Sequence, residues 1–287
     1  MIKKFSLILF KIIETLDNVF KKITNKSFLI YFNDFLIKSS YKKINILGNN
    51  VNFFIPNELT KWRVDTLFSL EPETLDWIDS FKNTQNIVFW DIGANIGLYS
   101  IYNALKNKNS KTISFEPSTS NLRVLSRNIS INNLENKIQI VPIPLTNKEN
   151  KFLMMKEHQF IEGGALNSFG ESFGFDGKDF QSDMNYKLFG TTINYLLDNN
   201  ILEIPDFIKI DVDGIEHLIL EGASKHLRNK KIKSLSIEIN ENFEHQYEKV
   251  LDIMKKNEFK ILHKKHNDEI LDKNSKFIKT FNYIFTR

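Results

Sequence analysis

The sequence has 287 residues, 41% of them hydrophobic and 13% aromatic, which is enough for a large core in one domain, alone or with an appendage. It has 0 cysteines, which excludes disulfides, thiolate zinc sites, iron–sulfur clusters and cysteine nucleophiles; no oxidising compartment is needed, so we expect a cytoplasmic protein. Residues 1–43 carry nine lysines against three acids, a net of +6, and because the whole chain is +4 the remainder nets −2, which argues against a nucleic-acid-binding surface.

Residues 1–43 are predicted to be a basic, amphipathic helical segment. Within residues 2–23 apolar side chains recur every three or four positions, the period of an amphipathic helix. The longest apolar run, Phe5 to Phe10, ends at Lys11, far short of the ~20 residues that span a bilayer. The favoured interpretation is a helix packed on the body of the protein. The alternatives are peripheral contact with an anionic membrane, at its inner face, and a partner-binding helix.

Residues 44–85 are predicted to be a lead-in to the main domain. Alternating apolar residues on both sides of a Gly-Asn-Asn run predict a hairpin over 44–55. Pro72 near the start of a helical pattern that ends near Phe81 predicts a helix that covers the sheet.

From residue 86 onwards, predicted strands and helices alternate. The expected strands are 87–91, 111–115, 138–143, 206–211, 232–239, 259–263 and 281–286. The expected helices are 97–106, 119–132, 189–199, 214–228 and 243–257. This alternation predicts an α/β fold over 86–287, with a mostly parallel seven-stranded sheet and helices on both faces. The polar connection 264–279 predicts a hairpin that places an antiparallel strand at one edge.

Residues 144–190 interrupt the alternation. Five of the chain's 11 glycines fall in 163–177, together with three phenylalanines that argue against disorder. A loop of this length in a compact domain is typically functional, so we predict a lid or substrate loop, with Asn167 and Ser168 contacting substrate.

The run NIVFWDIGANIGLYS, residues 86–100, predicts a buried strand, a glycine turn and the start of a helix. It lacks the three glycines of a dinucleotide fingerprint and the Gly-Lys-[Ser/Thr] of a P-loop. Asp91 at the strand end would repel a pyrophosphate but suits a ligand with an ammonium group, such as S-adenosylmethionine (SAM). The alternative is a structural turn without a ligand.

Glu116 ends the second strand, 25 residues after Asp91, close to where a ribose-binding acid follows a glycine turn. Its carboxylate oxygens accept hydrogen bonds from ribose hydroxyls. Pro117 then removes a backbone donor and turns the chain away.

A second group of polar residues follows the later strands. Asp211 ends strand 206–211, at the edge where open α/β sheets bind ligands. Asp213 and Glu216 match a capping box, with a direct role for Glu216 as the alternative. His217 is either a base or incidental. The remaining pair, Glu238 and Asn240, shares one strand face and, with Asp211, suits Mg²⁺ or a substrate hydroxyl.

Together these motifs resemble the FkbM family of SAM-dependent methyltransferases. The resemblance is carried by WDIGANIGLYS, FEPSTSNLRVLSRNISIN, FIKIDVDGIEHLILEGA and SIEIN, with WRVDTLFSLEPETLDWI upstream. It extends from about Asn57 to Ile239 and leaves residues 1–56 uncovered. It implies a Rossmann-like class I methyltransferase fold and methylation of a hydroxyl, often on a sugar or glycan such as a polysaccharide precursor.

The resemblance also implies residue roles. The turn from Asp91 to Gly97 would line the methionine end of the cofactor, Glu116 would hold the ribose, and Asp211 with Glu216 would belong to the active-site motif. Asp213 stands where the family more often has Glu. The predicted cofactor-binding residues are Asp91, Gly93, Ala94, Asn95, Gly97, Ser100, Glu116 and Pro117.

The expected reaction moves a methyl group from a sulfonium to a hydroxyl, with Asp211 as the first choice of base and His217 as the second. A nucleic-acid methyltransferase is disfavoured by the charge of the body and by the lack of an Asp/Asn-Pro-Pro-aromatic run, and a nicotinamide dehydrogenase by Asp91. The alternative is a non-catalytic SAM-binding or scaffold protein of a glycan-biosynthesis assembly. The oligomeric state is open.

Overall fold

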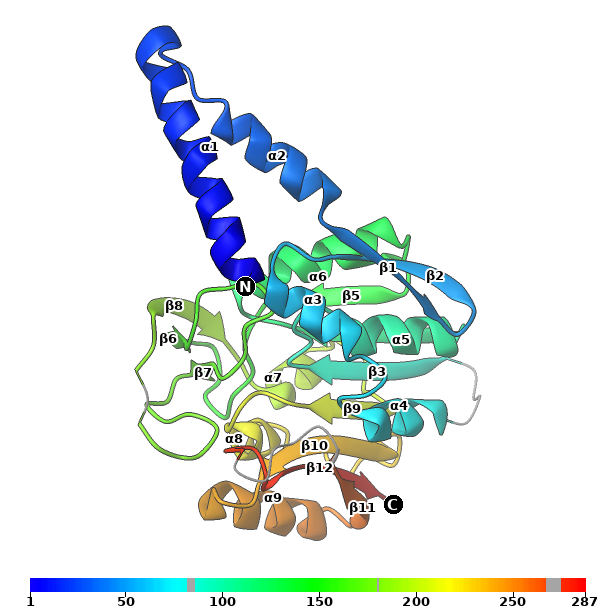
Figure 1. Ribbon diagram of the computed structural model, residues 1–287. Coiled ribbons are helices and arrows are strands. Elements are labelled where there is room, and N and C mark those ends of the chain that lie inside the picture. Colours follow the sequence, from blue (N-terminus) through cyan, green and yellow to red (C-terminus); the bar gives the residue numbers. More distant parts are fainter. Residues whose placement is uncertain (82–85, 180, 267–274) are drawn as a thin grey trace.

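The computed structural model describes residues 1–81, 86–179, 181–266 and 275–287. The described chain forms a layered body from which a helical arm projects (Figure 1). The middle of the connection predicted at 264–279, residues 267–274, lies outside the described residues.

The body is built on a seven-stranded sheet of described residues, in the order β11-β12-β10-β9-β3-β4-β5. The strands are β3 (Ile87–Ile92), β4 (Ser110–Phe115), β5 (Ile138–Val141), β9 (Phe207–Ile210), β10 (Ser234–Asn240), β11 (Lys260–Lys265) and β12 (Thr280–Thr286). Strands β5, β4, β3, β9 and β10 pair in parallel. The predicted mostly parallel α/β sheet is therefore confirmed.

The antiparallel strand lies one position in from the edge, not at the edge as predicted. Strand β12 pairs antiparallel with both β10 and β11. Its apolar side chains Tyr283, Ile284 and Phe285 are buried, whereas β11 carries three lysines and is mostly exposed. The lysine-rich strand takes the edge because charged edges resist pairing with other chains, and the apolar strand gains a second neighbour.

Helices cover both faces of the sheet (Figure 1). Side chains of β3 alternate between the two cores: Val88 and Trp90 face one, and Phe89 faces the other. The first core is closed by α7 (Ile193–Asp198), α8 (Glu216–Glu221) and α9 (Glu244–Lys256). The second is closed by α4 (Pro72–Asp79), α5 (Leu98–Lys106) and α6 (Thr119–Ile131).

Two predicted helices are shorter than expected. The first part of 189–199 belongs to a strand, and α8 starts only at Glu216 because Gly214 has a φ of 120°, outside the helical region.

The prediction of one long loop over 144–190 is wrong. Residues of this segment form a three-stranded antiparallel sheet, β7-β6-β8. Its strands are β6 (Lys151–Glu157), β7 (Ser168–Phe169) and β8 (Met184–Gly190). Lysines and apolar residues mix along these strands because much of the small sheet stays in contact with solvent, so the apolar signal is weak. The irregular stretch between β6 and β7 lies at the site described below.

The lead-in hairpin and helix are present. Strands β1 (Tyr41–Ile46) and β2 (Asn49–Phe54) pair antiparallel, and the Asn128 side chain on α6 accepts a hydrogen bond from the backbone of Phe54 at 2.8 Å. A further helix, α3 (Glu58–Asp65), begins with a capping box between Asn57 and Thr60. Helix α3 brings Arg63 to the site.

The arm consists of α1 (Ile2–Thr24) and α2 (Leu29–Ser39) (Figure 1). The predicted amphipathic helix is confirmed, but its packing on the body is wrong: Phe5 is 67% exposed and Leu16 58%. The two helices are joined to each other instead, because the buried Asp17 accepts hydrogen bonds from the backbone of Phe28 and Leu29 at the start of α2. In the described part of the chain no helix has the length and apolarity needed to cross a membrane.

Candidate active site

The turn after β3 is fixed by glycine. Gly93 has a φ of +89°, and a Cβ there would lie 1.8 Å from the carbonyl oxygen of Asp211. Only glycine therefore lets the end of β3 meet the end of β9. Gly97 has a φ of +88° and precedes α5.

Asp91 lies beneath this turn and is 1% exposed. Ser100 donates a hydrogen bond to its Oδ2 at 2.5 Å, and burial raises the pKa of the Asp91 carboxyl. Its Oδ1 has no hydrogen-bond partner among the described residues. A buried oxygen without a donor costs about 1–3 kcal/mol, so a ligand donor that reached it would stabilise the protein. Asp91 and Ser100 thus support the turn from below.

Glu116 closes the next strand and is 5% exposed. The backbone of Asn95 donates to its Oε2 at 2.8 Å, and the backbone of Ser118 donates to its Oε1 at 2.7 Å. Burial raises the pKa of Glu116 to about 8 despite these donors. The carboxyl is therefore held rigidly by the turn after β3 and by the start of α6, with both oxygens able to accept further hydrogen bonds.

Three adjoining cavities, formed by described residues, open at the carboxyl ends of β3, β4 and β9. All three are lined by Ala165, Asp211 and Asp213. The first, which we call the apolar cavity, is bounded by Phe115, Glu116, Pro117, Ile143, Asn167 and Ser168, among others. The second, the turn cavity, is bounded by Gly93, Ala94, Asn95, Tyr99, Arg63 and Lys209, among others.

The third, the outer cavity, has a volume of about 380 Å³. Its wall combines carboxylates with aromatic side chains: Glu71, Asp211, Glu238, Trp62, Phe277 and Phe281. The irregular stretch between β6 and β7 adds residues 158–159 and 164–166 to the wall. Part of the segment predicted as a substrate loop therefore does border the cavity.

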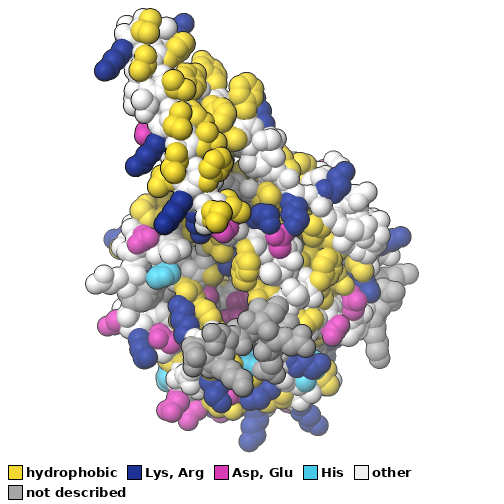
Figure 2. Space-filling model, viewed as in Figure 1, with side chains coloured by type: hydrophobic (Ala, Val, Ile, Leu, Met, Phe, Trp, Pro, Cys, Tyr) yellow, Lys and Arg dark blue, Asp and Glu magenta, His cyan; other side chains and the backbone are white. Residues whose placement is uncertain are grey.

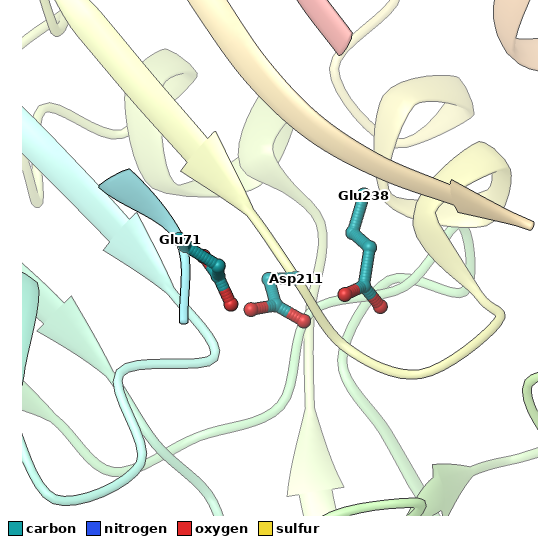
Figure 3. A group of neighbouring side chains, drawn as sticks. All are labelled: Glu71, Asp211 and Glu238. Atoms are coloured by element: carbon teal, nitrogen blue, oxygen red, sulfur yellow. The ribbon is translucent and has the colours of Figure 1, made fainter. Parts of the chain in front are cut away.

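Three carboxylates meet where the outer cavity joins the other two. Glu71, Asp211 and Glu238 each offer an oxygen, and these oxygens lie within 4.8 Å of one another. Figure 3 shows the side chains converging from the start of α4, the end of β9 and β10. Burial, and then the charge of Asp211, raise the pKa of Glu238 well above its ordinary value. Burial also raises the pKa of Glu71. The cluster therefore favours binding of a proton or of a cation.

One ammonium group partly neutralises this cluster. Lys209 is 1% exposed on β9, and its Nζ donates to Asp211 Oδ2 at 2.5 Å and lies 4.9 Å from the ring centre of Tyr99. Burial opposes its charge, but the charges of Asp211, Glu71 and Asp91 outweigh burial and raise the pKa of Lys209. Lys209 therefore stays protonated and fixes the orientation of Asp211.

Two candidates for acid–base chemistry lie away from these cavities. Glu216 is not part of a capping box with Asp213: its carboxylate accepts hydrogen bonds from the backbone of Val212 and Gly214, both at 3.0 Å, and from Gln246. Burial raises the pKa of Glu216 to about 7. His217 is 2% exposed and packs on Phe243 and His245; burial and then His245 lower its pKa to about 4. His217 lines none of the three cavities, so its position does not favour the prediction that it acts as a base.

Asp213 and Asn240 also differ from expectation. Asp213 accepts a hydrogen bond from the backbone of Leu166 at 2.7 Å, and burial, then Asp211, raise its pKa to about 6. Asn240 donates to the carbonyl oxygen of Phe175 at 3.1 Å and accepts from the backbone of Asn242 at 3.0 Å. Asn240, predicted as a ligand beside Asp211 and Glu238, thus holds the 163–177 stretch, and Glu71 takes the third position.

Three site residues were not identified from the sequence. They are Glu71, Lys209 and Arg63. The sequence does contain a signal for Lys209. A lysine inside a buried strand is unusual, and a residue two positions before Asp211 lies on the same face of the strand as Asp211. Glu71 and Arg63 lie in the upstream run WRVDTLFSLEPETLDWI, which contributes to the family resemblance but to which no site residue was assigned.

Known methyltransferases resemble this chain in sequence. The sequence model of the methyltransferase FkbM domain matches residues 91–261. Methyltransferase sdnD of Sordaria araneosa is 27% identical over 154 residues, which cover 47% of this chain and 60% of that protein. The chain therefore spans less than two thirds of this relative's length.

Distant likenesses occur among solved structures. Precorrin-6y C5,15-methyltransferase of Geobacter metallireducens has a TM-score of 0.43 and 12% identity, covering 76% of this chain and 86% of that one. M. jannaschii TYW2, solved with AdoMet, has a TM-score of 0.42 and 12% identity, and the match covers 86% of this chain and 87% of that one.

Proposed function

Because this chain belongs to the methyltransferase FkbM domain family, whose members are SAM-dependent, we propose that it transfers a methyl group from SAM to a hydroxyl of a sugar or glycan. The observation that carries the proposal is the junction of the three cavities at Asp211, where a cofactor side and an acceptor side meet.

SAM fits the apolar and turn cavities by its chemistry. The apolar cavity suits the adenine, and Glu116 at its wall suits the ribose hydroxyls. The turn cavity suits the methionine end, where Arg63 offers a cation to the carboxylate. Asp91 does not line the turn cavity, so its unpaired Oδ1 below the turn would reach the ammonium group only if the turn moved.

Two of the predicted substrate residues lie on the cofactor side. Asn167 and Ser168 line the apolar cavity, not the outer one. We therefore assign Asn167 and Ser168 to the binding of the cofactor. We place the acceptor in the outer cavity, beside Glu238 and Glu71.

The outer cavity suits a carbohydrate. Its aromatic side chains offer flat apolar faces to the C–H groups of a sugar ring, and its carboxylates accept hydrogen bonds from hydroxyls. Trp62 is 42% exposed at the wall of this cavity, which leaves its ring available to a ligand.

SAM, when bound, supplies an electrophilic methyl group on a sulfonium. The residues that line the outer cavity align the acceptor oxygen, and one of them takes its proton. We assign the proton to Asp211, because it lines both the cofactor cavities and the outer cavity. Lys209 holds one oxygen of Asp211, and Glu238 and Glu71 lie close enough to share the proton. A positioned base of this kind contributes roughly 10²–10⁴-fold.

A divalent cation is the alternative occupant of the three carboxylates, since Mg²⁺ prefers oxygen ligands. Lys209 argues against it, because its ammonium group already pairs with Asp211 at 2.5 Å. We propose a proton acceptor first and Mg²⁺ second.

The test has two stages. Calorimetric titration of the folded protein with SAM, with NAD as control, should show binding of SAM alone. Incubation with SAM and a panel of glycosides and nucleotide sugars should then yield a methylated product detected by mass spectrometry. Absence of SAM binding would remove the assignment, whereas SAM binding without transfer to any acceptor would favour a scaffold.

We propose the cytoplasm as the place of action, on the ground that a chain with 0 cysteines needs no oxidising compartment. Contact of residues 1–23 with the inner face of the membrane is a separate proposal that rests on the exposed arm.

A further inference from the structure

The arm is a preformed unit that keeps its apolar surface in solvent. Asp17 is 0% exposed between the two helices, where Ser27 donates to its Oδ2 at 2.7 Å and the backbone of Phe28 donates to its Oδ1 at 2.7 Å. Phe20 and Phe28 pack edge to face with ring centres 5.7 Å apart. These contacts fix the angle between α1 and α2 without covering the outer side of α1.

The exposed side of α1 is a broad apolar face. Seven residues follow the helical period along it: Ile2, Phe5, Leu9, Ile12, Leu16, Val19 and Ile23. Each of them is at least 47% exposed. Figure 2 shows yellow side chains gathered along the projecting arm. Exposure of this much contiguous apolar surface marks an interaction site.

The charge of the arm indicates which kind of partner would cover the apolar face of α1. Lys3, Lys4, Lys11, Lys21 and Lys22 lie on the other sides of α1, and residues 1–39, which carry seven lysines against three acids, net +4. A helix with lysines on its polar face and Phe, Leu and Ile on the other is typical of a helix that lies in a membrane interface. Lysines near an anionic lipid surface are attracted to it, whereas the rest of the chain, residues 40–287, has a net charge of 0 and is not.

A second copy of this chain fits the face less well. Two copies would bring two arms, each with a net charge of +4, together. The positions that flank the apolar stripe on one side are Ser6, Ile13 and Phe20, not the charged residues that specify coiled-coil partners. The apolar face is therefore wider than a coiled-coil seam.

We propose that α1 docks this protein on an anionic lipid surface, with its apolar face inserted at the level of the acyl chains and its lysines among the head groups. The arm is an interaction surface separate from the cavities around Asp211, and the proposal does not depend on the reaction catalysed there.

The experiment is co-sedimentation of the full chain with vesicles. We expect binding to phosphatidylcholine vesicles that contain phosphatidylglycerol, much weaker binding to phosphatidylcholine alone, and partial release by salt. Failure to bind the anionic vesicles would overturn the proposal, and equal binding to both vesicle types would overturn its electrostatic part.

A matched pair of double variants tests the face. Leu9→Gln with Leu16→Gln removes two leucines from the face, and Leu7→Gln with Phe10→Gln removes two apolar residues from the lysine-bearing side. The four side chains are similarly exposed, at 47%, 58%, 55% and 50%. We expect the first variant to bind at least ~10-fold more weakly and the second to stay near the parent. Equal weakening of both would contradict insertion of this face.

Sedimentation velocity tests whether a second copy of the chain, and not a lipid surface, covers the apolar face of α1. A dimer that the Leu9→Gln, Leu16→Gln variant returns to monomer, without binding of the parent to vesicles, would overturn the proposal. Thermal unfolding of each variant shows whether the body is folded, so loss of vesicle binding is separable from failure of the proposed function.

Discussion

The cofactor side and the acceptor side of Asp211 are built differently. On the cofactor side, one carboxyl, Glu116, is held by the backbone of Asn95 and Ser118, all close together in the sequence. On the acceptor side, Glu71, Asp211 and Glu238 come from distant parts of the chain and are partly neutralised by a buried lysine. The first arrangement suits recognition of a constant ligand by a rigid motif. The second concentrates charge where the proposed reaction would release a proton.

The largest expected effect is on the acceptor side. Asp211→Asn keeps the volume of the side chain but removes the proton acceptor, so the rate of transfer should fall by about 10²–10⁴-fold. SAM affinity, measured by calorimetry, should stay near that of the parent. Asp252→Asn, an exposed acid paired with Lys256, is the control. A large loss of SAM affinity in Asp211→Asn would break the division between the two sides.

The reciprocal change is Glu116→Gln on the cofactor side. Loss of charge-assisted hydrogen bonds to the ribose should weaken SAM binding by about 10–100-fold. The rate at saturating SAM should change little, because Glu116 lies away from the acceptor cavity. Thermal unfolding shows whether the variant is folded. An unchanged SAM affinity would remove Glu116 from the cofactor site.

The raised pKa of Glu116 predicts a pH dependence of SAM affinity. With a pKa of about 8, the free protein holds this proton at neutral pH. Ribose hydroxyls donate to the carboxylate, so SAM binding should release the proton, and affinity should rise by up to about tenfold per pH unit towards pH 8 and then level off. Calorimetry in phosphate and in Tris measures the released proton. Glu116→Gln should abolish the release, and release that persists would point to another group.

The contrast between local and distant contacts also explains which features could be predicted from the sequence. The seven main strands and the turn at Gly93 were predictable because apolar period and glycine spacing are local signals. Glu71 was not, because nothing near it in the sequence indicates that it meets Asp211, 140 residues later. The capping-box prediction at Asp213 failed because Gly214 is outside the helical region and delays α8 to Glu216. Tertiary contacts decide such positions.

The smallest expected effect comes from metal removal. This experiment decides whether the three carboxylates on the acceptor side hold a proton or a metal ion. If Lys209 and the shared proton neutralise the three carboxylates, treatment with a chelator should leave the rate within about twofold. The measurement is methyl transfer with a chelator, then with added Mg²⁺. Loss of activity that Mg²⁺ restores would show that the carboxylates hold a cation, and Lys209 would then have to give up its pairing with Asp211. In that case Glu238→Gln should raise the Mg²⁺ concentration needed for half-maximal rate, whereas Glu241→Gln, an acid paired with Lys264, should not.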